Sequence, residues 1–107
     1  VGYGEGAEIA NRLERNNVIV NYQATPDEEG FTASGALRMG VSEMTRFGFG
    51  EKEFAQLASL MAECILRGKE IGPDVAKLRA RHLEMGYCFN DEQFETALEK
   101  LAAKAGL

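Results

Sequence analysis

The hydrophobic positions of the chain follow a helical period most clearly between Glu51 and Arg67. Apolar residues recur there every three or four positions, which places them on one stripe of an amphipathic helix. Arg67 suits a last helical turn, and Gly68 after it is a typical stop. We therefore predict a helix from Glu51 to Arg67, with the apolar stripe Phe54, Leu57, Ala58, Met61, Cys64 and Ile65.

The first half of the chain combines helical and extended patterns. Ile9 and Leu13 share one face of a helix predicted over residues 5–16. Asn16 and Asn17 can end this helix, because Asn tolerates the left-handed conformation. A β-branched run at 18–22 predicts a strand, and the segment 31–41 predicts a second one.

Gly35 lies within the second extended segment, and Ser42 follows its end. Gly35 suggests an interruption, because a glycine inside a strand typically marks a bulge or a close backbone approach. Ser42 is placed as an N-cap, so we expect a helical turn over residues 42–48.

The rest of the chain predicts two more helices. Pro73 suits the first turn of a helix that we expect to run to about Met85 and to end at Gly86. Asn90 opens the last helix, with Gln93 three residues later as its capping-box partner. The apolar stripe of this last helix is Phe94, Ala97, Leu98 and Leu101.

The order of these elements is helix, strand, loop, strand and then helices. It predicts an α+β fold: a small two-layer domain in which helices cover one face of a short antiparallel sheet. Two or three strands leave much of a sheet face or edge open, so we expect another domain or another chain to cover it. The whole chain, residues 1–107, is expected to form one domain.

Composition narrows the possible partners. The net charge is −5, which argues against nucleic acid and anionic membranes, because both require a clustered basic face. No apolar run is long enough to span a bilayer. The chain lacks an initiating Met and begins VGYGEG, so we expect a piece of a longer protein, with a processed mature protein as the alternative.

The cysteines and the histidine predict no metal site. Cys64 and Cys88 are far apart in the sequence and read as reduced thiols of an intracellular, cytoplasmic protein. Cys64 lies on a predicted apolar face and is expected to be buried and inert. A zinc site requires about four ligands, which one histidine and two cysteines do not supply. His82 falls on the apolar side of its predicted helix, where packing is favoured over a catalytic role.

Arg38 stands in an unusual sequence environment. On a strand, Leu37 and Met39 point to one face. Arg38 then points to the other face, between the small residues Ala36 and Gly40, which leave room for another molecule to approach.

Two interpretations of Arg38 follow from these neighbours. It could be a surface arginine, either solvated or paired with a carboxylate such as Asp27 or Glu43, and spacing alone favours this interpretation. It could instead bind a ligand, since a guanidinium offers a rigid fork that matches a carboxylate in bidentate geometry.

The stretch SGALRMGVSEMTRFGF, from Ser34 to Phe49, resembles the signature of the serine hydroxymethyltransferase family. That signature has an S-G pair, then R-I-G-T-P-A, then an ending of the T-T-R-G-F type. Arg38, Gly40, Thr45 and Phe49 stand in corresponding places.

The flanking segments extend this resemblance to about half of the chain. The stretch before the signature is similar to the family's I-T-V-N-K-N-x-x-P segment and matches it at Val20, Asn21 and Pro26. The sequence GEKEFAQLASLMAECI after the signature resembles the family's acidic helix.

The resemblance implies the C-terminal small domain of a fold-type-I enzyme dependent on pyridoxal phosphate. Such an enzyme transfers a hydroxymethyl group between amino acids of the glycine and serine type and an acceptor. The resemblance implies that Arg38 binds the substrate carboxylate, with Ser34 of the S-G pair beside it. It also makes Asn21 and Gln23 candidates for contacting tetrahydrofolate. The implied partners are the amino-acid substrate, the protein's own large domain and a homodimer partner.

The five lysines give no candidate for a Schiff base. They fall on predicted helix faces or ends, outside any S-T-T-H-K type segment, and read as solvated: Lys52, Lys69, Lys77, Lys100 and Lys104. We therefore expect the missing domain to bind pyridoxal phosphate. The isolated chain, which offers no catalytic residue of its own, is expected to be inactive.

Departures from the signature leave the substrate open. Val41 and Ser42 replace the family's Thr-Pro, one extra residue precedes Arg38, and Gln23 stands where an Asn commonly contacts the pterin. A divergent relative acting on another β-hydroxy amino acid fits as well, such as a 2-methylserine hydroxymethyltransferase or a threonine-aldolase-like or transaldolase enzyme. The rival hypothesis is a non-catalytic α+β module for regulation or protein interaction.

Overall fold

The computed structural model describes residues 1–27, 33–87 and 90–107 of the chain. Its helices and strands, in chain order, are α1 (Gly6–Arg15), β1 (Asn21–Gln23), β2 (Ala36–Arg38), α2 (Ser42–Arg46), α3 (Glu51–Arg67), α4 (Gly72–Ala80) and α5 (Asp91–Ala105).

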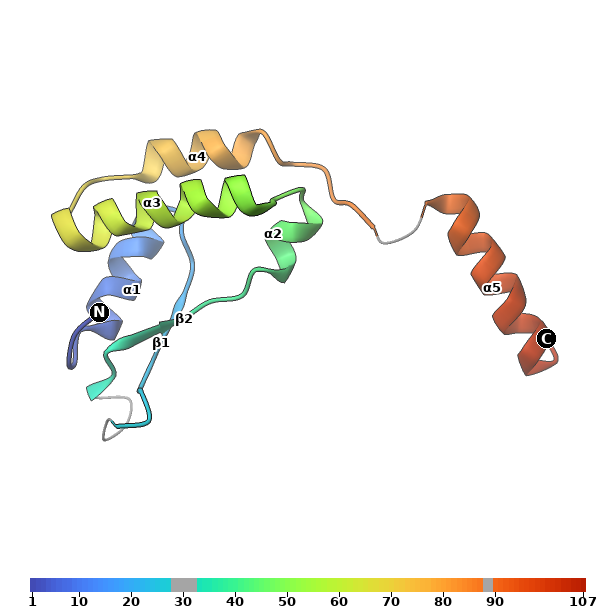
Figure 1. Cartoon of the computed structure of the whole chain (residues 1–107), viewed down its shortest axis with the longest axis horizontal. Coiled ribbons are helices and arrows are strands. Elements are labelled where there is room, and N and C mark those ends of the chain that lie inside the picture. Colours follow the sequence, from blue (N-terminus) through green and yellow to red (C-terminus); the bar gives the residue numbers. More distant parts are fainter. Residues whose placement is uncertain (28–32, 88–89) are drawn as a thin grey trace.

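Three helices form layers on one side of a short antiparallel β ribbon (Figure 1). α1 contacts both strands, α3 packs on α1, and α4 packs on α3. The predicted α+β fold, with helices on one face of the sheet, is therefore confirmed. The core lies where these three helices meet and contains Ile9, Leu13, Val18, Met61, Cys64, Ile71 and Val75.

The helix α3 matches its prediction from Glu51 to Arg67. Met61 and Cys64 of the predicted stripe are buried, whereas Ala58 is exposed at its edge. The chain leaves the helix through Gly68, whose φ of 65° permits the left-handed turn that ends it.

Both strands are shorter than predicted. The N–H group of Val18 donates to the carbonyl of Leu13 at 2.9 Å, so Val18 closes α1 instead of entering the ribbon. Asn17 adopts a φ of 69°, the left-handed conformation expected of an asparagine that ends a helix. The predicted second strand is confined to Ala36–Arg38, and its first part, within residues 28–32, lies outside the described residues.

Two helix boundaries were predicted wrongly. Ser42 is the first residue of α2, and Val41 occupies the N-cap. α4 ends at Ala80, well before the expected end near Met85.

The segment after α4 leaves the helix because it packs against the region around α2. Arg79 donates from its guanidinium to the carbonyl of His82 and lies 4.4 Å from the ring centre of Phe47. The N–H group of Gly86 donates to the carbonyl of Arg46. These contacts replace the next helical turn.

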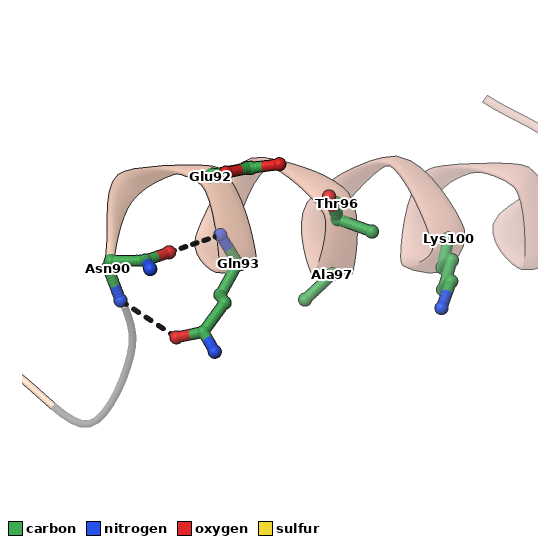
Figure 2. A pocket seen from close by; sticks show the side chains of 6 residues that line it. All are labelled: Asn90, Glu92, Gln93, Thr96, Ala97 and Lys100. Carbon is green, nitrogen blue, oxygen red and sulfur yellow. Dashed lines mark hydrogen bonds between the residues drawn. The ribbon is translucent and has the colours of Figure 1, made fainter.

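The last helix, α5, extends away from the other elements (Figure 1). Figure 2 shows the predicted capping box, in which the N–H group of Gln93 donates to the Asn90 side chain at 2.8 Å and the Gln93 side chain accepts from the Asn90 N–H at 3.0 Å. Its predicted apolar stripe is present but unburied, since Phe94, Leu98 and Leu101 are 54%, 49% and 64% exposed. Local capping therefore forms this helix without a packed face.

A buried amide joins the three core helices. Asn16, at the end of α1, is 2% exposed, and its Oδ1 accepts from the N–H groups of Ile71 and Gly72 at 2.7 and 2.9 Å. These N–H groups open α4 and have no partner within that helix. Asn16 therefore caps α4 from another element.

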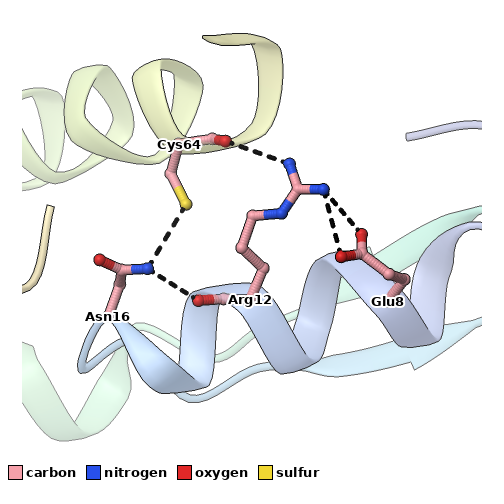
Figure 3. A network of polar contacts seen from close by, with 4 residues as sticks. All are labelled: Glu8, Arg12, Asn16 and Cys64. Atoms are coloured by element: carbon pink, nitrogen blue, oxygen red, sulfur yellow. Dashed lines mark hydrogen bonds and ion pairs between the residues drawn. The ribbon is translucent and has the colours of Figure 1, made fainter. Parts of the chain in front are cut away.

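The nitrogen of the same amide reaches back into α1 and across to α3 (Figure 3). The Nδ2 group of Asn16 donates to the carbonyl of Arg12 at 3.0 Å and to Sγ of Cys64 at 3.9 Å. Arg12 in turn donates to the carbonyl of Cys64 and forms an ion pair with Glu8 at 2.9 Å. Each polar atom of the Asn16 side chain thus has a partner.

Replacing Asn16 should destabilise the fold. Asn16→Ala removes the acceptor of the buried Ile71 N–H and of the part-buried Gly72 N–H, which costs about 1–3 kcal/mol of unfolding free energy. Asn11→Ala, in the exposed part of α1, is the matched control and should change stability by less than about 0.5 kcal/mol. Urea unfolding measures both variants, and equal stability of the two would contradict the capping role.

Replacing a leucine by alanine should destabilise the chain in the core but not in α5. Leu13→Ala removes a fully buried side chain and should cost about 2–5 kcal/mol. Leu98→Ala removes a half-exposed side chain and should stay within about 0.5 kcal/mol. Urea denaturation of the 107-residue chain checks this, and a comparable loss in both variants would mean that α5 packs against the core.

Candidate functional site

The register of the ribbon brings the predicted site residues together. Asn21 pairs with Arg38, and Gln23 pairs with Ala36. Because directly opposed residues of an antiparallel pair project to the same side, Asn21, Gln23 and Arg38 share one face.

The other face of the ribbon belongs to the core side. Tyr22 pairs with Leu37, and Leu37 packs against the hydrophobic core. Asn21, Gln23 and Arg38 are all exposed on the face that does not pack. Their side chains are therefore available to a ligand.

Arg38 has no charge partner within the part of the chain that the structure describes. Neither Asp27 nor Glu43 forms an ion pair with it, so the pairing considered from the sequence is absent there. An exposed guanidinium of this kind keeps its donors free for an incoming carboxylate.

A shallow, open hollow of about 580 Å³ lies beside Arg38. Gln23 and residues 24–26 line it from one side, and residues 36–39 line it from the other. Ala36, with its small side chain, stands opposite Gln23 and two positions before Arg38 on the same face of the ribbon. The arrangement offers a positive charge and an amide to one small polar ligand.

Ser34 is placed differently. It is 2% exposed, and its carbonyl accepts from the N–H group of Gly6 at 2.8 Å. Ser34 therefore lies beneath the surface, just before β2, and does not line the hollow beside Arg38.

The sequence analysis missed the contact between α1 and the site. Gly6 touches the backbone of the segment that leads to Arg38, and this contact joins residues distant in sequence. The available signal was the glycine at every second position of GYGEG.

A second hollow, of about 440 Å³, lies along α5 (Figure 2). Among the described residues, those that line it belong to that helix and its cap. It is distant from the ribbon, and it brings together none of the predicted site residues.

Comparison with known proteins relates this chain to one family. A serine hydroxymethyltransferase of Pyrobaculum arsenaticum is 38% identical over 90 residues, which cover 81% of this chain and 21% of that protein. The serine hydroxymethyltransferase of Saccharolobus islandicus is 35% identical over 108 residues, covering 96% of this chain and 24% of that protein. The chain belongs to the serine hydroxymethyltransferase family. It spans about a fifth of the length of the curated relatives it matches.

Two further comparisons gave no match. No family model matches the chain, and no solved structure matches it. The family assignment therefore rests on the sequence relatives.

The lysines were considered as sites for a Schiff base, and all five lysines of this chain are exposed. A lysine that forms a Schiff base needs a lowered pKa, which burial or a cationic neighbour provides. The lysines described here do not fit that role.

His82 packs against an aromatic ring. His82 lies just after α4, half-buried, with its ring edge against Phe49 at 4.9 Å between ring centres. Within the described residues, no three His, Cys, Asp or Glu side chains are arranged to hold a metal ion. Nor do those residues include a helix with the length and apolarity needed to cross a membrane.

Cys64 is buried, as predicted, and Cys88 lies outside the described residues. Burial raises the pKa of the Cys64 thiol, since a thiolate would lose its hydration there. A raised pKa reduces the thiolate fraction at neutral pH, so Cys64 is unsuited to nucleophilic chemistry.

Cys64 should react slowly with a thiol reagent. In a Cys88→Ser variant, Ellman's reagent at pH 8 should modify the folded chain at least about 100-fold more slowly than the urea-unfolded chain. Because folding raises the thiol pKa, this group lowers stability only as pH rises above the ordinary thiol pKa. Equal rates in the folded and unfolded chains would contradict the burial of Cys64.

Proposed function

We propose that this chain is the C-terminal small domain of a serine hydroxymethyltransferase-like enzyme, and that Arg38 binds the α-carboxylate of its amino-acid substrate. One observation carries the proposal. Arg38 borders the hollow beside the ribbon and has no ion-pair partner among the described residues.

The chemistry of Arg38 suits a positioning role. Its guanidinium can donate two parallel hydrogen bonds to one carboxylate, which fixes the plane of the amino acid as well as its location. Correct orientation of a bound reactant can lower a barrier by several kcal/mol. The small Ala36 beside it leaves space for the α-carbon of glycine or of a serine-type substrate.

The cofactor belongs to the proposed remainder of the enzyme. Pyridoxal phosphate, when bound, supplies an electron sink for reactions at the α-carbon. The exposed lysines of this chain do not suit its attachment, so we place its site in a large domain beyond these 107 residues. The isolated chain should accordingly be inactive.

The two amides on the Arg38 face suit a second ligand. We propose Asn21 and Gln23 as contacts for tetrahydrofolate, because both can donate to and accept from a pterin ring. Their place on the same face as Arg38 supports this assignment. For Ser34, whose side chain is buried, we propose an indirect contribution through the backbone that leads into β2.

The proposed enzyme also requires partners within its own assembly. We propose the large domain and a homodimer partner as these partners. The relatives are about five times longer than the region they share with this chain, which supports a further domain.

The exposed apolar stripe on α5 is the observation that favours the rival hypothesis, a non-catalytic interaction module. On that hypothesis Arg38 is an ordinary surface residue, and amino-acid affinity does not depend on it. Substitution of Arg38 therefore distinguishes the two functions.

In the full-length protein, Arg38→Ala should weaken glycine binding by about 100-fold, because two charge-assisted hydrogen bonds are lost. Arg38→Lys should bind with intermediate affinity, since it keeps the charge and loses the fork. Isothermal titration calorimetry with glycine gives the affinities, and the absorbance of the bound cofactor should stay unchanged.

The matched control is Arg67→Ala, which removes an exposed arginine from the end of α3. It should bind glycine with wild-type affinity. Normal glycine affinity in Arg38→Ala would overturn the carboxylate role and leave the interaction module as the better account.

A further inference from the structure

The glycine-rich start of the chain runs beside the segment that leads into β2. The N–H groups of Gly2, Gly4 and Gly6 donate to the carbonyls of Gly35, Ala33 and Ser34, at 3.4, 3.3 and 2.8 Å. These acceptors immediately precede Ala36, the first residue of β2.

Gly6 makes the closest approach in this contact. It is buried at the first turn of α1, where a Cβ atom would lie 2.7 Å from the carbonyl oxygen of Ser34 and 3.2 Å from that of Ala36. The same Cβ would lie 3.0 Å from Cβ of Tyr22 on β1. A side chain at this position must therefore push α1 away from both strands.

The ribbon is short, so its position depends on the elements that pack against it, α1 above all. Each strand has three residues, and a two-stranded ribbon is marginally stable without packing against another element. Arg38 is the last residue of β2, two positions after Ala36. A displacement of the backbone at Ser34 and Ala36 is thus carried directly to Arg38.

We propose that Gly6 is a positioning residue for Arg38: its missing side chain lets α1 hold β2 where the guanidinium meets the substrate carboxylate. This inference rests on the proposed function of Arg38. A displacement near 1 Å at a positioning group can cost about 100-fold in rate, so small shifts of β2 are sufficient to matter.

The test uses the full-length protein and isothermal titration calorimetry with glycine. Gly6→Ala should weaken glycine binding by about 10- to 100-fold, because a displaced Arg38 loses one or both of its charge-assisted hydrogen bonds to the carboxylate. Urea unfolding of the same variants records how much stability each substitution removes.

A matched pair of variants covers the case in which Gly6→Ala does not fold. Gly4 and Gly68 have φ values of 71° and 65°, so alanine strains the backbone similarly at both positions. Gly4→Ala disturbs the segment bonded to Ala33, whereas Gly68→Ala disturbs the end of α3. Gly4→Ala should weaken glycine binding several-fold, and Gly68→Ala should leave it unchanged at an equal loss of stability.

The outcomes separate this inference from the function it rests on. If Arg38→Ala weakens glycine binding as predicted while Gly6→Ala and Gly4→Ala bind normally, the positioning role is overturned and the carboxylate role stands. If Arg38→Ala binds normally, the proposed function fails, and the positioning role fails with it. Equal losses of affinity in Gly4→Ala and Gly68→Ala would also overturn the positioning role.

Discussion

The side-chain amide of Asn16 accepts from the first N–H groups of α4 while it donates into α1 and toward Cys64 of α3, and the helical layers depend on it. An amide in an apolar core is tolerated only when its donors and acceptors are matched. Here the match comes from three separate helices, so the amide fixes their relative placement as well as their proximity. Both strands in turn lie against α1.

The local features of the fold could be predicted because their causes are local. The stripe of α3, the left-handed Asn17 and the Asn90–Gln93 capping box each depend on residues within a few positions of one another. The same holds for the alternation that separates Leu37 from Arg38. That Arg38 and Leu37 lie on opposite faces could therefore be predicted from the strand alone. The signature around Arg38 could be recognised from the sequence alone.

The remaining features depend on contacts between segments distant in the chain. α4 ends early because the N–H group of Gly86, after it, donates to the carbonyl of Arg46. β1 starts late because the N–H group of Val18 donates to the carbonyl of Leu13 in α1. The register that places Asn21 and Gln23 beside Arg38 is likewise a property of two strands together. A periodic pattern in one segment carries no information about which distant backbone will satisfy its N–H groups.

One face of the ribbon packs against α1 and the other is exposed, and this difference affects which substitutions the domain tolerates. Leu37 and the backbone near Gly6 hold the ribbon to α1, whereas Asn21 and Gln23 are exposed on the opposite side. Exchanges on the outer face therefore carry little folding penalty. The side chains of this surface can therefore be exchanged one at a time while the scaffold beneath it remains the same.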